Sequence, residues 1–176
     1  RSLMLSGSCG GAARPWSLAT GSQLAVFEVH DAAVSGVAFS ERGPLTVGHD
    51  GTVRLWNYSG LQIDILDDYK KVLDVAHSDG TSVWSTATGR VCVRTGEGVH
   101  ELDNHDGQAT AVAISERGTV ASGGKNGEVF LHERGTLERF QEFQFEAAIW
   151  CLVLTDSCLA VGTDSGEIHR LERNGG

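Results

Sequence analysis

The sequence predicts an all-β chain built from about five copies of one short unit. Three observations predict this fold class. A glycine followed by a β-like alternation and a bulky residue recurs along the chain, and the segments between these glycines divide into short apolar runs. No stretch of ten or more residues shows a helical period of apolar side chains. Recurrence at a fixed interval is the mark of a repeat architecture.

The repeat glycines are almost evenly spaced. The intervals between them are 40, 38, 38 and 39 residues, which is difficult to produce by chance. The tetrapeptide Ser-Glu-Arg-Gly occurs at 40–43 and again at 115–118, 75 residues later, which is two repeats. The five glycines are Gly11, Gly51, Gly89, Gly127 and Gly166.

Each repeat is predicted to contain four short strands. In the second repeat they are residues 34–40, 45–48, 52–56 and 61–66, and in the fourth 109–115, 119–123, 128–133 and 137–144. Asp50-Gly51 supplies the tight turn between the second and third strands. Four short antiparallel strands in every ~40 residues match a blade of a β-propeller. One blade cannot bury both of its faces alone, so it must stack on its neighbours.

The repeats lie near residues 1–29, 30–66, 67–104, 105–144 and 145–176 of one partial propeller domain. The chain opens on a second strand at 3–7 and closes on a third strand at 167–172. About 18 strands result, two of them in the first repeat, and the first and last blades are incomplete. An open arc would expose its end faces and strand edges, so we expect blades outside this sequence to complete the ring.

Composition and charge exclude several classes of partner. The 14 basic and 23 acidic residues give a net charge of -9, with no block of Lys or Arg, so we expect no nucleic-acid partner. No apolar run approaches the ~20 residues of a membrane helix, so we expect no membrane insertion. The four cysteines form no Cys-x-x-Cys pair, which indicates free thiols in a reducing compartment, the cytoplasm or, as the alternative, the nucleus.

No catalytic, cofactor or metal site is predicted. The segment 123–127 has the glycines and lysine of a phosphate-binding loop, but the spacing fails, Asn126 replaces the required Ser or Thr, and a strand follows. The seven histidines show no metal-ligand spacing. No Ser or Cys nucleophile is paired with a base and an orienting acid. We therefore expect a protein that is not an enzyme.

The repeats resemble the WD-repeat family, whose pattern is Gly-His before the first strand, an Asp in the turn before the third strand, and Trp-Asp at its end. The matches here are Val29-His30, Asp50 and Trp56-Asn57. The resemblance implies a propeller, usually of seven blades, with a buried hydrogen-bonded network. It assigns this network to His30, Thr46, Asp50 and Trp56 in the second repeat, and to His105, Ser122 and Asn126, with His132 in the place of Trp, in the fourth. Thr88 and Ser165 occupy the Asp position in the third and fifth repeats, so we expect those blades to be less rigid.

The resemblance also implies a binding face, because partners usually contact the narrow top of such rings. The main positions that map to it are His49, Lys71, Leu73, Gln108, Lys125, Trp150 and Asp164. Strand alternation turns Ile149 toward a neighbouring blade and leaves Trp150 at the channel or top rim. Tryptophan is enriched at interface hot spots. The alternative is that Trp150 packs between blades.

A narrower resemblance lies in the fifth repeat. Segments 148–154 (Ala-Ile-Trp-Cys-Leu-Val-Leu), 160–162 (Ala-Val-Gly) and 165–168 (Ser-Gly-Glu-Ile) are similar to the final blade of the phospholipase A-2-activating protein family. That resemblance implies a protein-interaction scaffold that binds ubiquitin through its top face and works with an AAA ATPase complex. The alternative is a structural WD-repeat segment of a large cytoskeletal or ciliary assembly.

Overall fold

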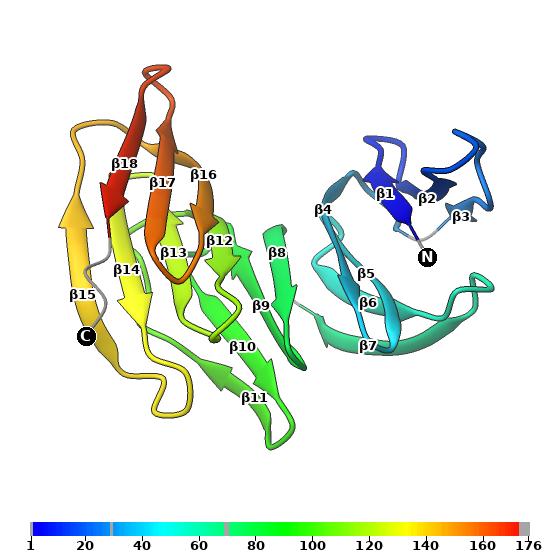
Figure 1. Ribbon diagram of the computed structural model, residues 1–176, viewed down its shortest axis with the longest axis horizontal. Coiled ribbons are helices and arrows are strands. Elements are labelled where there is room, and N and C mark those ends of the chain that lie inside the picture. The colour runs from blue at the N-terminus through cyan, green and yellow to red at the C-terminus, as the bar shows by residue number, and fades with distance from the viewer. Residues whose placement is uncertain (1, 29, 69–70, 173–176) are drawn as a thin grey trace. The chain divides into compact units, whose positions relative to one another are not determined.

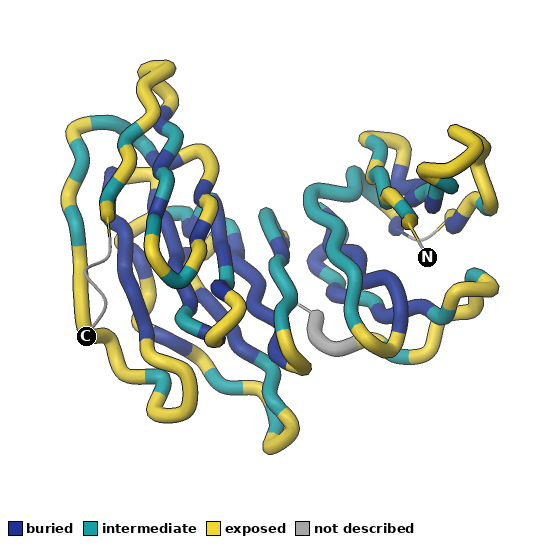
Figure 2. Tube along the Cα trace, in the orientation of Figure 1, coloured by how far each residue is buried: buried dark blue, intermediate teal, exposed yellow. Residues whose placement is uncertain are grey.

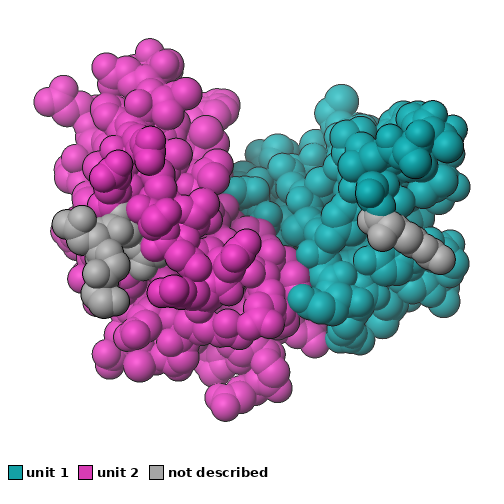
Figure 3. Space-filling view, viewed as in Figure 1, with its two compact units in different colours: residues 1–75 teal, residues 76–176 magenta. Residues whose placement is uncertain are grey.

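The computed structural model describes residues 2–28, 30–68 and 71–172. All regular structure in these ranges is β-strand, and the strands pair with their neighbours in antiparallel fashion. The described residues contain no helix long and apolar enough to cross a membrane. Residues 1–75 (unit 1) and 76–176 (unit 2) form two compact units (Figure 3).

Unit 1 contains two sheets whose strands follow one another in chain order (Figure 1). Sheet 1 consists of β1 (Leu3–Gly7), β2 (Ala12–Ser17) and β3 (Phe27–Glu28). Sheet 2 consists of β4 (Val34–Ser40), β5 (Gly43–Gly48), β6 (Thr52–Trp56) and β7 (Gln62–Asp68).

Sheet 1 has three strands and not the two that the sequence predicts. Its third strand, β3, is only two residues long, too short for a period of two to appear in the sequence. An irregular segment precedes β3, and its Gln23 bridges back to Trp16 on β2. Val29, the residue that was matched to the Gly of the Gly-His pattern, lies outside the described residues.

Unit 2 contains most of sheet 3 and all of sheets 4 and 5. Sheet 3 has the order β11-β10-β9-β8, and the division between the units falls within β8. Its strands are β8 (Val72–Ser78), β9 (Thr81–Thr86), β10 (Val91–Thr95) and β11 (Gly98–Glu101). Sheet 4 consists of β12 (Ala109–Ile114), β13 (Val120–Gly124), β14 (Glu128–His132) and β15 (Arg139–Gln144). Sheet 5 consists of β16 (Ile149–Leu154), β17 (Cys158–Thr163) and β18 (Ile168–Glu172).

The strand bounds follow the predicted pattern closely, with one instructive difference. The sequence predicts that Leu137 begins the last strand of the fourth repeat, but it lies in the turn before β15 with a φ of +59°. Its side chain packs against the apolar cluster that contains Val112 and Val120. An apolar residue in the turn before a strand therefore contributes to the core. The alternation of apolar and polar residues does not distinguish it from a residue of the strand.

The repeat glycines are required by the backbone. All five have φ between +83° and +92°, a region that L side chains rarely adopt. Gly127 also has no room for a side chain, because a Cβ at this position would lie 2.1 Å from the carbonyl oxygen of Phe145. In return, the Phe145 N–H donates to the carbonyl oxygen of Gly127 at 2.9 Å. The N–H of His105 donates to the carbonyl oxygen of Gly89 in the same way at 3.0 Å, so these glycines tie their hairpin turns to the chain that leads into the next repeat.

Burial concentrates on the middle strands of the sheets (Figure 2). All residues of β5, β9 and β13 are buried. In unit 2, the largest apolar cluster lies between sheets 4 and 5, and its members come from both. In unit 1, Ala13 and Phe27 of sheet 1 pack against Trp56 of sheet 2, with the Phe27 and Trp56 rings stacked at 6.0 Å. Adjacent sheets thus share apolar cores face to face, as blades of a propeller do.

Candidate functional site

Sheet 2 contains a continuous chain of hydrogen bonds from one side chain to the next. Trp56 Nε1 donates to Thr46 Oγ1 at 2.9 Å, and Thr46 Oγ1 lies 2.8 Å from His30 Nε2. His30 Nδ1 lies 2.9 Å from Asp50 Oδ1. Because the indole can only donate, Thr46 accepts from Trp56 and donates to His30, and His30 donates from Nδ1 to the Asp50 carboxylate. The four residues that the sequence assigned to this network lie together.

Two further residues of β6 join the network, and the family pattern did not indicate them. Thr52 Oγ1 donates to Asp50 Oδ1 at 3.0 Å, and Arg54 pairs with Asp50 Oδ2 at 3.2 Å. Burial raises the pKa of Asp50, but the N–H of Thr52 and the His30 side chain outweigh it and hold that pKa below its usual value. Burial lowers the pKa of His30 more than Asp50 raises it. His30 is therefore neutral and Asp50 charged at neutral pH.

Sheet 4 contains a partial counterpart. His105 Nε2 lies 2.9 Å from Ser122 Oγ, which matches the pairing of His30 with Thr46. Glu128 Oε2 lies 3.4 Å from His105 Nδ1, and the backbone carbonyl of Asn126 accepts a hydrogen bond from the Gln144 side chain. Burial lowers the pKa of His105 to about 4, although the nearby Glu128 raises it.

His132 stands where the network would have a Trp, and a second cluster forms around it. The side chain of His132 is 1% exposed, and neither ring nitrogen has a hydrogen-bond partner among the described residues. Asp103 Oδ2 lies 3.6 Å from His132 Nε2 and 3.2 Å from Arg139 Nε. The Arg139 guanidinium covers the Phe130 ring at 4.6 Å, and Phe130 stacks on His105 at 4.3 Å. Burial lowers the pKa of His132, and the nearby Asp103 carboxylate, which raises that pKa, offsets only part of the effect.

Sheets 3 and 5 replace the network with a pair of hydroxyls at the hairpin turn. Thr86 Oγ1 lies 3.0 Å from Thr88 Oγ1, and Thr163 Oγ1 lies 2.8 Å from Ser165 Oγ. Thr86 and Thr163 also donate to the carbonyl that follows the repeat glycine. In sheet 3, the fully buried Trp84 occupies the strand position of Thr46. The indole Nε1 of Trp84 has no hydrogen-bond partner among the described residues, so this position does not link a network as Thr46 does.

The first strand of three sheets is interrupted at the same place. The pairing of β4, β12 and β16 shifts register at Ser35, Thr110 and Trp150 respectively, as in a β-bulge. Ser35 Oγ donates to the carbonyl of Val72 at 2.7 Å, and Thr110 Oγ1 donates to the carbonyl of Ile149 at 2.6 Å. In sheets 2 and 4, the bulge therefore turns a hydroxyl onto the first strand of the following sheet.

Trp150 stands at this bulge in sheet 5 and behaves differently. Its side chain is 72% exposed, whereas the preceding Ile149 is fully buried in the cluster between sheets 4 and 5. The described residues therefore do not enclose Trp150 between two sheets. An exposed indole on a strand that is anchored by its neighbours gives the molecule a large apolar contact surface.

The remaining predicted contact residues lie at repeated backbone positions. The N–H groups of His49, Lys125 and Asp164 donate to the carbonyls of Ala33, Gln108 and Ala148 at 2.9, 2.9 and 3.0 Å. Lys71, Lys125 and Asp164 are exposed, and His49, Leu73 and Gln108 are half-buried. Burial and then the positive charge of Lys71 lower the pKa of His49. The structure brings His49 close to Lys71 in unit 1 and Gln108 close to Lys125 in unit 2.

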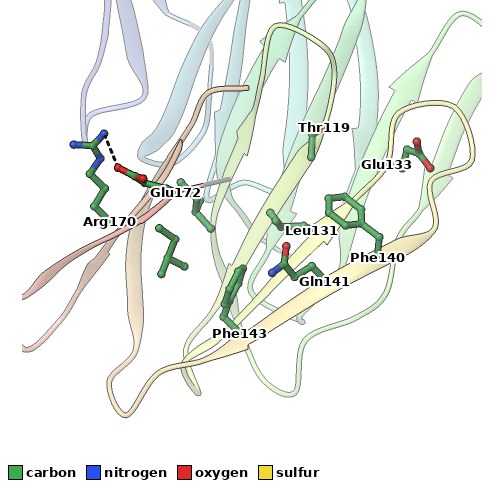
Figure 4. A pocket seen from close by; sticks show the side chains of 10 residues that line it. Thr119, Leu131, Glu133, Phe140, Gln141, Phe143, Arg170 and Glu172 are labelled. Atoms are coloured by element: carbon green, nitrogen blue, oxygen red, sulfur yellow. Dashed lines mark ion pairs between the residues drawn. The ribbon is translucent and has the colours of Figure 1, made fainter. Parts of the chain in front are cut away.

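A groove of about 850 Å³ lies between sheets 4 and 5 of unit 2 (Figure 4). Leu131, Phe140 and Phe143 form one side, and Arg170 and Glu172, which form an ion pair at 3.6 Å, form the other. The groove runs beside β18, which is the outermost strand of sheet 5 among the described residues. Free strand edges and apolar grooves are both features that protein partners use.

No metal-binding arrangement is found in residues 2–28, 30–68 and 71–172, where no group of three or more His, Cys, Asp or Glu side chains could hold an ion. Three buried histidines each lie near one carboxylate instead: His30 is hydrogen-bonded to Asp50, and His105 and His132 lie 3.4 Å from Glu128 and 3.6 Å from Asp103. Such pairs position side chains and shape the interior of a blade.

Comparison with known proteins supports the fold. Residues 21–57 match the family model described as WD domain, G-beta repeat. The chain is 25% identical over 151 residues to telomerase protein component 1 of Rattus norvegicus, an alignment that covers 73% of this chain and 6% of that protein.

Two solved structures resemble almost the whole chain. The computationally designed Ika8 protein has a TM-score of 0.85 at 23% identity, covering 98% of this chain and 56% of that one. The RRP9 WD40 repeats have a TM-score of 0.84 at 20% identity, covering 97% and 58%. The chain thus spans between half and two thirds of these structures and a small part of its rat relative. Residues 21–57 thus match a WD-repeat model, and the described residues have the all-β fold of a partial WD40-type β-propeller.

Proposed function

We propose that this chain is a non-catalytic protein-interaction scaffold whose partners bind around Trp150. The observation that carries the proposal is the 72% exposure of this indole on a β-bulge, at the position where Ser35 and Thr110 turn inward. Exposed Trp on a rigid strand is a typical interface hot spot, because little side-chain entropy is lost on binding. Ile149 beneath it is fixed in the core.

A role within a multi-component assembly is supported by the rat relative, which is named as a protein component of telomerase. The likeness covers only 6% of that protein, so the role rests on the name and on the fold. An assembly of the cytoskeletal or ciliary kind is the alternative setting.

The four free cysteines favour a reducing compartment, and we place the protein in the cytoplasm or nucleus.

The specific partner that we propose is ubiquitin, in the context of an AAA ATPase complex. The support is the resemblance of residues 148–168 to the final blade of the phospholipase A-2-activating protein family, together with the exposure of Trp150 within that stretch. The net charge of -9 also favours protein partners over a phosphate backbone.

Titration of isotope-labelled ubiquitin with the chain, followed by NMR, tests this proposal. We expect saturable shifts with the native chain, and Trp150→Ala to weaken the affinity about thirtyfold, as loss of a hot spot of about 2 kcal/mol does. Val99→Ala is the matched control, because Val99 is an exposed apolar residue on sheet 3. Absence of shifts removes ubiquitin as the partner, and an unchanged affinity in Trp150→Ala removes the site.

A further inference from the structure

The turn between β14 and β15 of sheet 4, residues 133–138, is fastened to sheet 3 by an arginine. Arg134 Nη2 lies 2.6 Å from Asp79 Oδ2, and it also donates to the carbonyl oxygen of Asp79 at 3.3 Å. Asp79 belongs to the turn between β8 and β9 of sheet 3. We call residues 133–138 the strap, because they reach from their own sheet to its neighbour within unit 2.

The strap also places one apolar side chain in the core. Leu137 packs against the apolar cluster that sheets 3 and 4 share, whose members include Val83, Val91, Val112 and Val120. Leu137 is half-buried, whereas every other residue of the strap is exposed. The strap is therefore held to the two sheets in two ways, by an ion pair at the surface and by apolar packing beneath it.

Leu137 adopts a backbone conformation that leucine disfavours. Its φ is +59°, and its N–H donates to the carbonyl oxygen of Glu133 at 3.0 Å. The corresponding turn of sheet 1 has glycine at this position, where the N–H of Gly21 donates to the carbonyl oxygen of Ser17 at 2.8 Å with a φ of +67°. Glycine adopts positive φ without steric cost, and leucine does not. Among the described residues, only Leu137 and Asp79 combine a side chain with positive φ, and the strap joins them.

A glycine leaves room for the arginine side chain of the strap. A Cβ at Gly118 would lie 2.3 Å from Cδ of Arg134. Gly118 ends the second copy of the Ser-Glu-Arg-Gly tetrapeptide, and in the first copy Gly43 is approached instead by the carbonyl oxygen of Trp56. The arm of Arg134 thus runs through a confined space, so its pairing with Asp79 costs less side-chain entropy than that of a free surface arginine.

We infer that the strap is a charge-controlled latch on the apolar core between sheets 3 and 4. In the closed state, the ion pair of Arg134 with Asp79 holds Leu137 in the cluster against the strain in its own backbone. When the pair is screened or neutralised, this strain releases the turn and Leu137 leaves the cluster. Release uncovers the apolar side chains of both sheets that Leu137 covers.

The latch responds to charge because its ion pair lies at the surface. The side chains of Arg134 and Asp79 are 42% and 68% exposed, so water and salt weaken their attraction. A pair of this kind contributes only a small part of the stability of a domain. Its loss therefore opens the strap locally, while the strands beneath remain paired.

Hydrogen exchange of the whole chain, followed by mass spectrometry, tests the inference. Asp79→Asn removes the charge, and asparagine adopts positive φ as readily as aspartate does. We expect peptides that cover the strap to exchange about threefold faster in this variant, as loss of a surface ion pair predicts. Glu172→Gln is the matched control, because it breaks the exposed ion pair of Glu172 with Arg170 and should leave the exchange of the strap unchanged.

Salt and a double variant complete the test. Raising the salt from about 0.05 M to about 1 M should accelerate exchange of the strap in the native chain but not in Asp79→Asn. Asp79→Asn combined with Arg134→Gln should exchange no faster than either single variant, because the pair is already broken. Equal exchange in the native chain and Asp79→Asn overturns the inference, as does a salt effect that persists in Asp79→Asn. Acceleration that extends to the buried strand β13 also overturns it, because Asp79 would then stabilise all of sheet 4 and not the strap.

Discussion

At the scale of the residue, Thr46 holds the network of sheet 2 together. Its single hydroxyl accepts from Trp56 and donates to His30, and all three side chains are buried. The family resemblance named the four members, because their spacing in the second repeat follows the WD pattern. It could not name Thr52 and Arg54, since their part depends on which way β6 turns its polar side chains.

Thr46→Val is expected to lower the free energy of unfolding by about 1–3 kcal/mol. Valine keeps the shape of the side chain but leaves the indole N–H of Trp56 and a ring nitrogen of His30 buried without partners. Urea denaturation followed by circular dichroism measures the change. Thr136→Val, at an exposed turn position, is the control and should change little. Equal stability of the two variants would show that the network contributes nothing.

The buried histidines of sheet 4 predict a loss of stability in mild acid. The folded-state pKa of His105 is about 4 and that of His132 is also lowered, while the unfolded chain takes up protons at the ordinary value near 6.5. Stability is therefore complete above pH ~6.5 and is lost as the pH falls toward about 4. The groups that face this pair are Glu128, Asp103 and Arg139.

Urea titrations at pH 7.5 and pH 5 check this expectation. His105 alone should account for about 2 kcal/mol of the difference in unfolding free energy between these pH values. His105→Gln should reduce the pH dependence, because glutamine does not titrate. His100→Gln, which replaces a partly exposed histidine of β11, should retain it. A pH dependence unchanged by His105→Gln would contradict the assignment.

At the scale of the element, the repeat depends on the hairpin between its second and third strands. The glycine there was visible in the sequence as a regular marker. The structural requirement for glycine was not visible in the sequence, because the carbonyl group that approaches Gly127 belongs to Phe145, 18 residues further on. Likewise, alternation predicted most strands but not the bulges at Ser35, Thr110 and Trp150, which depend on how the first strand meets the next sheet.

Gly127→Ala should destabilise the chain by at least about 1 kcal/mol more than Gly135→Ala. Both glycines have positive φ, +87° and +95°, so both substitutions carry the same backbone strain. Only Gly127 has a carbonyl oxygen in the space of the new Cβ, whereas nothing lies within 4 Å at Gly135. The difference between the urea midpoints of the two variants measures the cost of the close approach apart from the backbone strain. If they agree, the close approach of Phe145 costs nothing.

At the scale of the whole molecule, the repeat period predicted the fold but not which side chains are exposed on the surface. Five repeats and an all-β chain follow from short-range patterns, because a blade is built from neighbouring strands. The exposure of Trp150 could not be derived in this way, since alternation allowed both a rim position and packing between blades. The approach of Glu128 to His105 was also hidden, because the family pattern points to Asn126 at this turn and not to the residue after the repeat glycine.

The tryptophans have a consequence for following this protein in solution. The chain has four, and sheets 1, 2, 3 and 5 contain one each: Trp16, Trp56, Trp84 and Trp150. Trp84 is fully buried, Trp56 stacks on Phe27 and is bonded to Thr46, and Trp150 is in water. Indole fluorescence depends strongly on such surroundings. Variants that keep one tryptophan at a time would therefore report the opening of individual sheets without any attached dye.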